Sequence, residues 1–331
     1  KGDYGPQTPH LALFERTFVN LNHRAAALCR TLIDRAAAVR AEVHELAGAT
    51  LIDLGVKAPG GLEAGLALAD ICLAGLGRVS LVSADPALWR GPAIAVQTDQ
   101  PLLACLASQY AGWQIAQGKY FAMGSGPMRA AAGKETLFQQ LLAREAAACA
   151  VGVLETSKLP PAEVIGYLAE QCGVAAGSLT LLAARTASQA GTVQVVARSV
   201  ETALHKLHEL GFDLARIESG WGVAPLPPVA ADDMAGIGRT NDAVLYGGEV
   251  TLWVRGDDAS LEAIGPRVPS SASPDYGEPF ANIFARYGHD FYKIDPHLFS
   301  PATVTFMNLD TGRTLRFGRT LPEVIAKSFL G

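Results

Sequence analysis

The polar residues best suited to acid–base chemistry lie along one predicted helix. From Thr192 to Leu210, apolar residues recur every three or four positions, as they do on the buried side of an amphipathic helix. At about 100° per residue, a row of polar side chains borders that apolar side: Gln194, Arg198, Glu201, His205 and His208. Arg198 and Glu201 are three residues apart, so a guanidinium and a carboxylate can meet there on one face.

Two interpretations of this pair remain open. Spacing alone favours a solvated ion pair, which contributes roughly a few tenths of a kcal/mol to stability. Alternatively, the row faces a cleft and Glu201 is placed to take a proton from water. Burial would then raise the pKa of Glu201 while Arg198 would lower it, and the balance would leave a base usable near neutral pH.

The histidines of the row form no recognisable metal motif. His205 and His208 match neither the H-E-x-x-H nor the H-x-x-E-H order, and no cysteine lies near them in sequence, so we expect no metal site. The cysteines are five in number, widely spaced, and never in a C-x-x-C pair: Cys29, Cys72, Cys105, Cys149 and Cys172. We expect them to be small buried residues.

A glycine-rich turn precedes another predicted helix. Gly124-Ser125-Gly126-Pro127 leads into Met128–Ala132, and proline suits the first turn of a helix. The turn either offers backbone N–H groups to an anion or is a plain strand-to-helix connection. It is not a dinucleotide fingerprint, because Arg129 stands where glycine is required. The chain also contains no P-loop and no G-x-S-x-G elbow.

The composition excludes several classes of protein. A chain of 331 residues with 49% hydrophobic and 18% charged residues is globular, with two domains or one large unit. A net charge of −5 and the lack of any basic run argue against nucleic-acid binding. The longest uncharged stretch, Gln100–Gly118, is too polar for a membrane span, and Lys1–His10 lacks a signal-peptide pattern. We therefore expect a cytoplasmic protein.

The first half of the chain alternates between strand and helix patterns, which indicates layered α/β packing. The predicted helices are 16–46, 62–74, 102–110, 128–132 and 162–172, and the predicted strands are 49–56, 93–98 and 151–155.

The second half carries two hairpin signals. One places Gly247-Gly248 between strands at 243–246 and 250–254, and the other places Asp310-Thr311-Gly312 between 303–308 and 314–317. Antiparallel strands thus join the parallel pattern, and we expect an α+β fold with mixed sheets flanked by helices. The expected domains are 1–175 (α/β) and 176–331 (α+β), with a ligand cleft between them. The chain can pass between the two domains more than once.

Six long motifs together resemble one family: residues 59–65, 119–127, 197–202, 238–242, 268–273 and 293–299. From about Asn20 to Gly331 the chain is similar to the methenyltetrahydromethanopterin cyclohydrolases, and residues 197–210 are most similar to the bacterial, methylotroph-type members. The family's catalytic arginine and glutamate fall on Arg198 and Glu201. Arg185 departs from the pattern, since a proline commonly precedes the threonine at this place.

The resemblance implies a fold and an activity. The expected protein is a two-domain subunit of a homotrimer that binds a pterin in the cleft between its domains and uses no metal or organic cofactor. It hydrolyses the methenyl bridge of 5,10-methenyltetrahydromethanopterin, or of a dephospho-type variant, in one-carbon metabolism. The alternatives are a non-catalytic tetrahydropterin-binding subunit and an unrelated oligomerisation protein. The pair Arg198 and Glu201 argues against the non-catalytic subunit.

Further residues are candidate contacts to the pterin. The set combines the glycine-rich turn, one residue of the polar row and residues expected in cleft-facing loops: Gly124, Ser125, Gly126, Gln194, Thr240, Asn241, Ser271, Tyr276 and Phe280. Because the coenzyme carries an anionic tail and the chain is net negative, local cations must attract it. The candidates are Lys119, Arg129, Lys134, Arg239 and Lys293.

Overall fold

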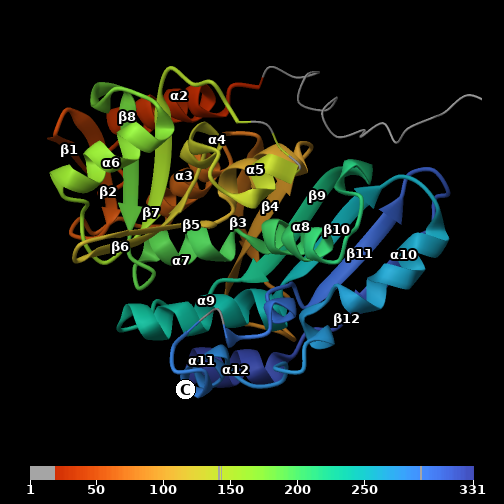
Figure 1. The fold of residues 1–331 in the computed structure, drawn as a ribbon. Helices are drawn as coiled ribbons and strands as arrows, with labels where there is room; N and C mark the ends of the chain where they lie inside the picture. Colours follow the sequence, from red (N-terminus) through yellow and green to blue (C-terminus); the bar gives the residue numbers. More distant parts are fainter. Residues whose placement is uncertain (1–18, 141, 143, 291–292) are drawn as a thin grey trace, which may run out of the picture.

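Two six-stranded mixed sheets form the framework of the computed structural model, which describes residues 19–140, 142, 144–290 and 293–331 (Figure 1). We name them sheet A and sheet B. Sheet A has the order β1 (Glu42–Leu46), β2 (Ala49–Gly55), β8 (Leu179–Ala184), β7 (Ala150–Glu155), β6 (Tyr120–Ser125), β5 (Trp113–Gln117). Sheet B has the order β12 (Thr314–Gly318), β11 (Thr303–Asn308), β10 (Glu249–Val254), β9 (Ile217–Pro225), β4 (Pro92–Thr98), β3 (Gly77–Ser83). The expected α+β fold is confirmed.

Both sheets mix parallel and antiparallel neighbours. In sheet A, β8 pairs in parallel with β2 and β7, and in sheet B, β10 pairs in parallel with β11. Each sheet also takes strands from both sides of residue 175, because β8 belongs to sheet A while β3 and β4 belong to sheet B. The sheets themselves therefore do not divide at that residue, and the expected domain boundary stays a prediction.

Helices cover the sheets. The longer ones are α2 (Leu21–Asp34), α3 (Leu62–Cys72), α6 (Ala162–Cys172), α7 (Gln189–Val196), α8 (Ser199–Glu209), α9 (Asp233–Gly247) and α12 (Pro322–Leu330). The shorter ones are α4 (Met128–Ala132), α5 (Thr136–Gln140), α10 (Asp258–Ile264) and α11 (Phe280–Arg286), and η1 (Leu102–Gln109) is a π-helix. The expected helices at 62–74, 128–132 and 162–172 are confirmed, as are the strands at 49–56, 93–98 and 151–155.

The predicted long helix 16–46 is wrong in its second part. Residues 16–18 lie outside the described part of the chain, and the helix ends at Asp34. A turn with Arg40 at φ 59° follows, and Glu42–Leu46 becomes strand β1. Ala47 and Gly48 have φ of 51° and 84°, as a tight hairpin between β1 and β2 requires. The apolar residues that continued the helical period, Val43 and Leu46, instead lie exposed on an edge strand.

The first predicted hairpin is also wrong. Residues 243–246 belong to α9, and Gly247 ends that helix without a positive φ at either glycine. Because α9 packs against α7, α11, α12 and β9, all of 243–246 is buried, and a helix buried on every side gives the same apolar run as a buried strand. The second hairpin, β11 with β12, is confirmed.

Close approach of α8 to sheet B depends on two glycines of β9. A Cβ atom at Gly220 would lie 2.7 Å from Val200 Cγ1, and one at Gly222 would lie 2.4 Å from Ser199 Oγ. These glycines let the first turn of α8 lie directly on the strand.

Candidate active site

The helix predicted from Thr192 to Leu210 is in fact two helices. α7 ends at Val196, and Arg198, with φ −92° and ψ 10°, precedes the first residue of α8. The apolar stripe continues through the break, which is why periodicity did not reveal it. α7 packs against α3 and β2, whereas α8 packs against β9 and β10, so the break lies where the chain passes from sheet A to sheet B (Figure 1).

Arg198 and Glu201 form a buried pair at this break. Arg198 Nη1 lies 3.9 Å from Glu201 Oε2, and the two side chains are only 8% and 5% exposed. The interpretation as a solvated ion pair is therefore wrong. Glu201 is the third residue of α8, where the positive end of the helix dipole favours a carboxylate.

The guanidinium of Arg198 is fixed from two further elements. Nη1 donates to the carbonyl oxygen of Gln109 at 2.5 Å, and Nη2 donates to Ser125 Oγ at 3.1 Å. Gln109 ends η1, and its side-chain Nε2 donates to the carbonyl of Ala197 at 3.0 Å. The helix break is thus held by a residue that the sequence did not single out.

Burial changes the acidity of Glu201. Removal from water raises the pKa of its carboxyl to about 7, against the lowering effects of Arg198 first and Arg129 second. A carboxyl with this pKa can accept and return a proton near neutral pH. The arrangement therefore suits general acid–base chemistry.

Two other expected site residues join the same buried cluster. Ser125 Oγ lies 3.4 Å from the sulfur of Cys72, and Gln194 Nε2 lies 3.9 Å from that sulfur. Cys29, Cys72, Cys105 and Cys172 are buried as expected, whereas Cys149 is only half-buried. Gly124 and Gly126 flank Ser125 and are buried, and the N–H of Gly126 already donates to the carbonyl of Ser108 at 2.8 Å.

The remaining candidate contacts lie elsewhere. Thr240 and Asn241 are on α9 rather than in a loop, and their side chains bond the carbonyls of Gly236 and Ile237. Phe280 begins α11 and is fully buried beside other rings, so it is a core aromatic. Ser271 is exposed, and the ring of Tyr276 lies 5.1 Å from that of Tyr246. Their contacts with a ligand stay predictions.

The polar row continues along α8 without gathering metal ligands. His205 stacks on Tyr110 with ring centroids 4.6 Å apart, and His208 is half-buried. Within the described ranges, no three His, Cys, Asp or Glu side chains cluster so as to hold a metal ion.

The candidate cations differ in their surroundings. Lys119, Lys134 and Lys293 are exposed, although Lys134 Nζ also donates to Tyr167 Oη at 3.0 Å. Arg239 is half-buried and donates to the carbonyl of Pro228. Arg129 is fully buried and paired with Glu135, so it is not free to attract an anion.

Arg185 makes a contact that a proline could not. Its Nη2 lies 3.1 Å from Asp233 Oδ2, and Asp233 Oδ1 accepts from the N–H of Ala187 at 2.9 Å. The loop before α7 is thereby tied to the start of α9.

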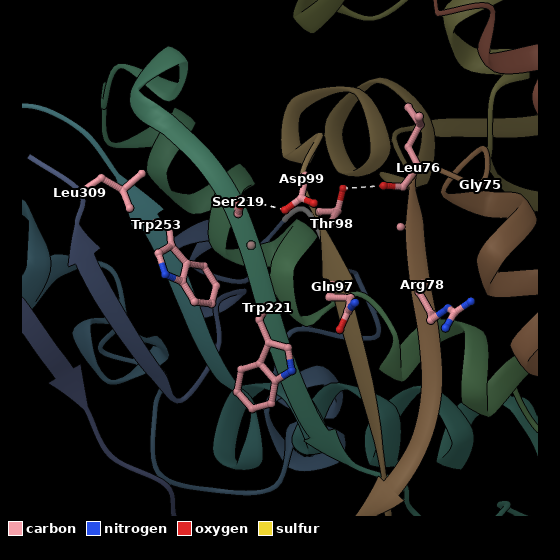
Figure 2. Close-up of a pocket in the computed structure, with 12 residues that line it drawn as sticks. Gly75, Leu76, Arg78, Gln97, Thr98, Asp99, Ser219, Trp221, Trp253 and Leu309 are labelled. Atoms are coloured by element: carbon pink, nitrogen blue, oxygen red, sulfur yellow. Dashed lines mark hydrogen bonds between the residues drawn. The ribbon is translucent and has the colours of Figure 1, made fainter.

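A pocket of about 520 Å³ lies on the opposite face of sheet B from α8 (Figure 2). Gly220 faces Val200 of α8, and because side chains alternate along a strand, Ser219 and Trp221 face the pocket. Ser219 Oγ donates to Asp99 there at 2.8 Å. The pocket is therefore separate from the Arg198–Glu201 pair.

No helix in the described part of the chain combines the length and apolar character that a membrane span needs.

A buried carboxylate and guanidinium lie at the junction of two mixed sheets in this α+β protein, an arrangement suited to acid–base chemistry. Residues 20–329 match the model of the family described as Cyclohydrolase (MCH), and the chain belongs to that family. It is 49% identical to the methenyltetrahydromethanopterin cyclohydrolase of Rhodopirellula baltica, covering 94% of this chain and 95% of that protein. Proteins of the same name from Methylobacillus flagellatus and Methanosarcina barkeri are 46% and 42% identical, each over 94% of this chain and over 95% and 98% of their own lengths.

Proposed function

We propose that this chain hydrolyses the methenyl bridge of 5,10-methenyltetrahydromethanopterin, or of a dephospho-type variant, to the N5-formyl compound. The relatives that carry this activity in their names match nearly the whole chain. The observation that carries the proposal on this chain is the buried pair of Glu201 and Arg198, with the pKa of Glu201 raised to about 7.

The reaction needs a proton acceptor more than an electrophile. The methenyl carbon lies between two nitrogens that share a positive charge, so it is already open to attack by water. As the water oxygen bonds to this carbon, Glu201 takes a proton from it and a neutral hydroxyl adduct forms. No metal ion is required to polarise such a carbon, and we expect chelators to leave turnover unchanged.

Ring opening returns the proton. Protonated Glu201 donates to N10 as the bond between the carbon and N10 breaks, and the formyl group remains on N5. The proton left on the hydroxyl oxygen is released, so the cation and water yield the neutral formyl compound and one proton. Arg198 orients the carboxylate of Glu201 and limits the rise in its pKa.

Glu201→Gln tests the role of the carboxylate. The absorbance of the methenyl pterin follows hydrolysis directly, and we expect a loss of kcat of at least about a hundredfold with little change in KM. Glu209→Gln, an exposed glutamate on the same helix, is the matched control. Near-normal turnover by Glu201→Gln with the pterin bound would refute the assignment.

The same measurements address the alternatives. A non-catalytic pterin-binding subunit would bind the pterin at micromolar levels without consuming it. An unrelated oligomerisation protein would not bind it at all.

We also propose a cytoplasmic homotrimer. The outer face of sheet B, opposite α8, supports an assembly because it is left open in the single chain and is available to a second copy. One row of side chains across this face is exposed or half-buried: Arg78, Gln97, Trp221, Thr251, Thr305 and Arg316. Two of its large apolar residues, Trp221 and Trp253, lie beside the pocket (Figure 2). A mass of three chains by light scattering is the expected result, and cell fractionation tests the location.

A further inference from the structure

A second arginine is buried beside the catalytic pair. Arg129, on α4, is 0% exposed, and each of its three guanidinium nitrogens has an oxygen partner other than Glu201. Nε donates to Glu135 Oε1 at 2.7 Å, Nη2 lies against Glu135 Oε2, and Nη1 donates to the carbonyls of Leu106 and Ser108 at 2.9 and 3.2 Å. The guanidinium also lies over the ring of Tyr110, 5.0 Å from its centroid.

The C-terminal end of η1 holds both arginines. In a π-helix each N–H bonds five residues back, and the last such bond runs from Tyr110 N to the carbonyl of Cys105. Carbonyls beyond that point are free to accept, and they lie at the negative end of the helix dipole. Leu106 and Ser108 bind Arg129, while Gln109 binds Arg198.

Arg129 and Arg198 are linked by a second route as well. The carbonyl of Ser108 accepts from the N–H of Gly126 at 2.8 Å, and the adjacent Ser125 accepts from Arg198. A displacement of Arg129 would therefore move the two groups that orient Arg198.

We propose that Arg129 and Glu135 are positioning residues for the hydrolysis, which act through η1 on Arg198 and through their charges on Glu201. The inference rests on the proposed role of Glu201. Glu135, whose side chain is 17% exposed, offsets the charge of Arg129 without contacting the catalytic pair.

The protonation states of the groups around Glu201 determine which charges shift its pKa. From η1 and the residue after it, Cys105 and Tyr110 stay protonated, because burial raises the pKa of Cys105 well above its usual value and that of Tyr110 to about 12. His205, on the same helix as Glu201, has its pKa lowered by burial, which favours its neutral form. Among the described groups that shift Glu201, the charged ones are Arg198 and Arg129.

The two substitutions move the pH profile in opposite directions. Arg129→Gln removes a positive charge, so the pKa of Glu201 rises and the acid limb of kcat/KM moves to higher pH. Glu135→Gln leaves that charge uncompensated, so the limb moves to lower pH. Both variants lose roughly tenfold in kcat, because Arg198 is less well oriented. Arg129→Lys keeps the charge and restores the position of the limb, with kcat still reduced.

Two controls separate this effect from damage to the fold. Arg144 Nε also holds α4, donating to the carbonyl of Ala131 at 2.7 Å, so Arg144→Gln loosens α4 without a shift of the limb. The double variant Arg129→Gln/Glu135→Gln removes both charges, so the limb moves back from its position in Arg129→Gln toward its original pH.

The experiment combines pH-rate profiles with infrared titration of the Glu201 carboxyl, identified by its loss in Glu201→Gln. Opposite shifts for Arg129→Gln and Glu135→Gln in both measurements support the proposal. Loss of activity with an unmoved limb, or shifts of the same sign, would overturn it. If Glu201→Gln were fully active, the proposed role of Glu201 would fail, yet the infrared titration would still test the coupling of charges.

Discussion

Arg198 donates a hydrogen bond to Ser125 that joins the residue before α8, a helix packed on sheet B, to the end of β6 in sheet A. Arg198 is therefore held by two acceptors, the side-chain hydroxyl of Ser125 and the backbone carbonyl of Gln109.

We expect Ser125→Ala to lower kcat several-fold and leave KM nearly unchanged, because the variant loses one of the contacts that orient Arg198. The buried guanidinium donor left without that partner costs about 1–3 kcal/mol of stability. Steady-state kinetics and urea unfolding measure the two effects. Ser219→Ala, on the far face of sheet B, should change neither kcat nor KM.

Hydrolysis should show an acid limb near pH 7, since water attack requires the deprotonated form of Glu201 and its pKa lies at about 7. The rate rises as pH increases through this value. A profile of kcat/KM against pH measures it, and a limb near pH 4.5 would show that the reacting carboxyl is not buried.

Glu201 should also make the wild-type protein less stable as pH rises. Its folded pKa is raised from 4.5 to about 7, so between these values the folded state holds more protons than the unfolded state and unfolding becomes easier with increasing pH. Glu201→Gln removes this dependence, and its stability relative to wild type should increase by roughly 3 kcal/mol at most from pH 4 to pH 8. Urea unfolding across this range measures the slope. An unchanged difference between the two proteins would contradict the assignment of the raised pKa.

Gly222→Ala should separate α8 from β9, because the new Cβ would lie 2.4 Å from Ser199 Oγ. We expect a loss of about 1–3 kcal/mol in stability and a fall in kcat, since Glu201 shares the displaced turn. Gly166→Ala, at an exposed helical position with nothing within 4 Å of the new methyl, should be neutral or stabilising. Thermal unfolding and the absorbance assay compare the two variants.

Trp221→Glu should break the proposed assembly, because a charge placed on the outer face of sheet B cannot be buried between chains without a partner. Light scattering would show single chains. Phe121→Glu, at a 53% exposed residue of β6, is the control and should leave the mass unchanged. A wild-type protein that already runs as a single chain would contradict the assembly itself.

The sequence predicts an element well where residues next to it in the chain mark its two ends. α6 spans Ala162–Cys172 as expected, because prolines precede it and Gly173, with φ 70°, ends it. The structure has helix rather than strand at 243–246, because residues on all sides of the last part of α9 are buried by neighbouring elements, and no local pattern records tertiary burial of this kind.

The sequence predicts those parts of the site in which side chains carry the chemistry, and it does not predict contacts made by backbone groups. Arg198 and Glu201 stand at a recognisable spacing, but their burial depends on β9 and η1, which are distant in sequence. Gln109 acts on Arg198 through its backbone carbonyl, and any residue type has one. The available signal was the presence of Ser108 and Gln109 at the end of an apolar stretch, where buried polar residues require partners.

The π-helix also limits how the chain can vary in length. Each hydrogen bond of this eight-residue segment spans five residues instead of four, so deleting one residue between Leu102 and Gln109 would rotate and shift the carbonyls that follow the deletion. Arg129 and Arg198 would then lose their acceptors in a single step. Related sequences that keep both arginines should therefore tolerate substitutions within this segment far better than insertions or deletions.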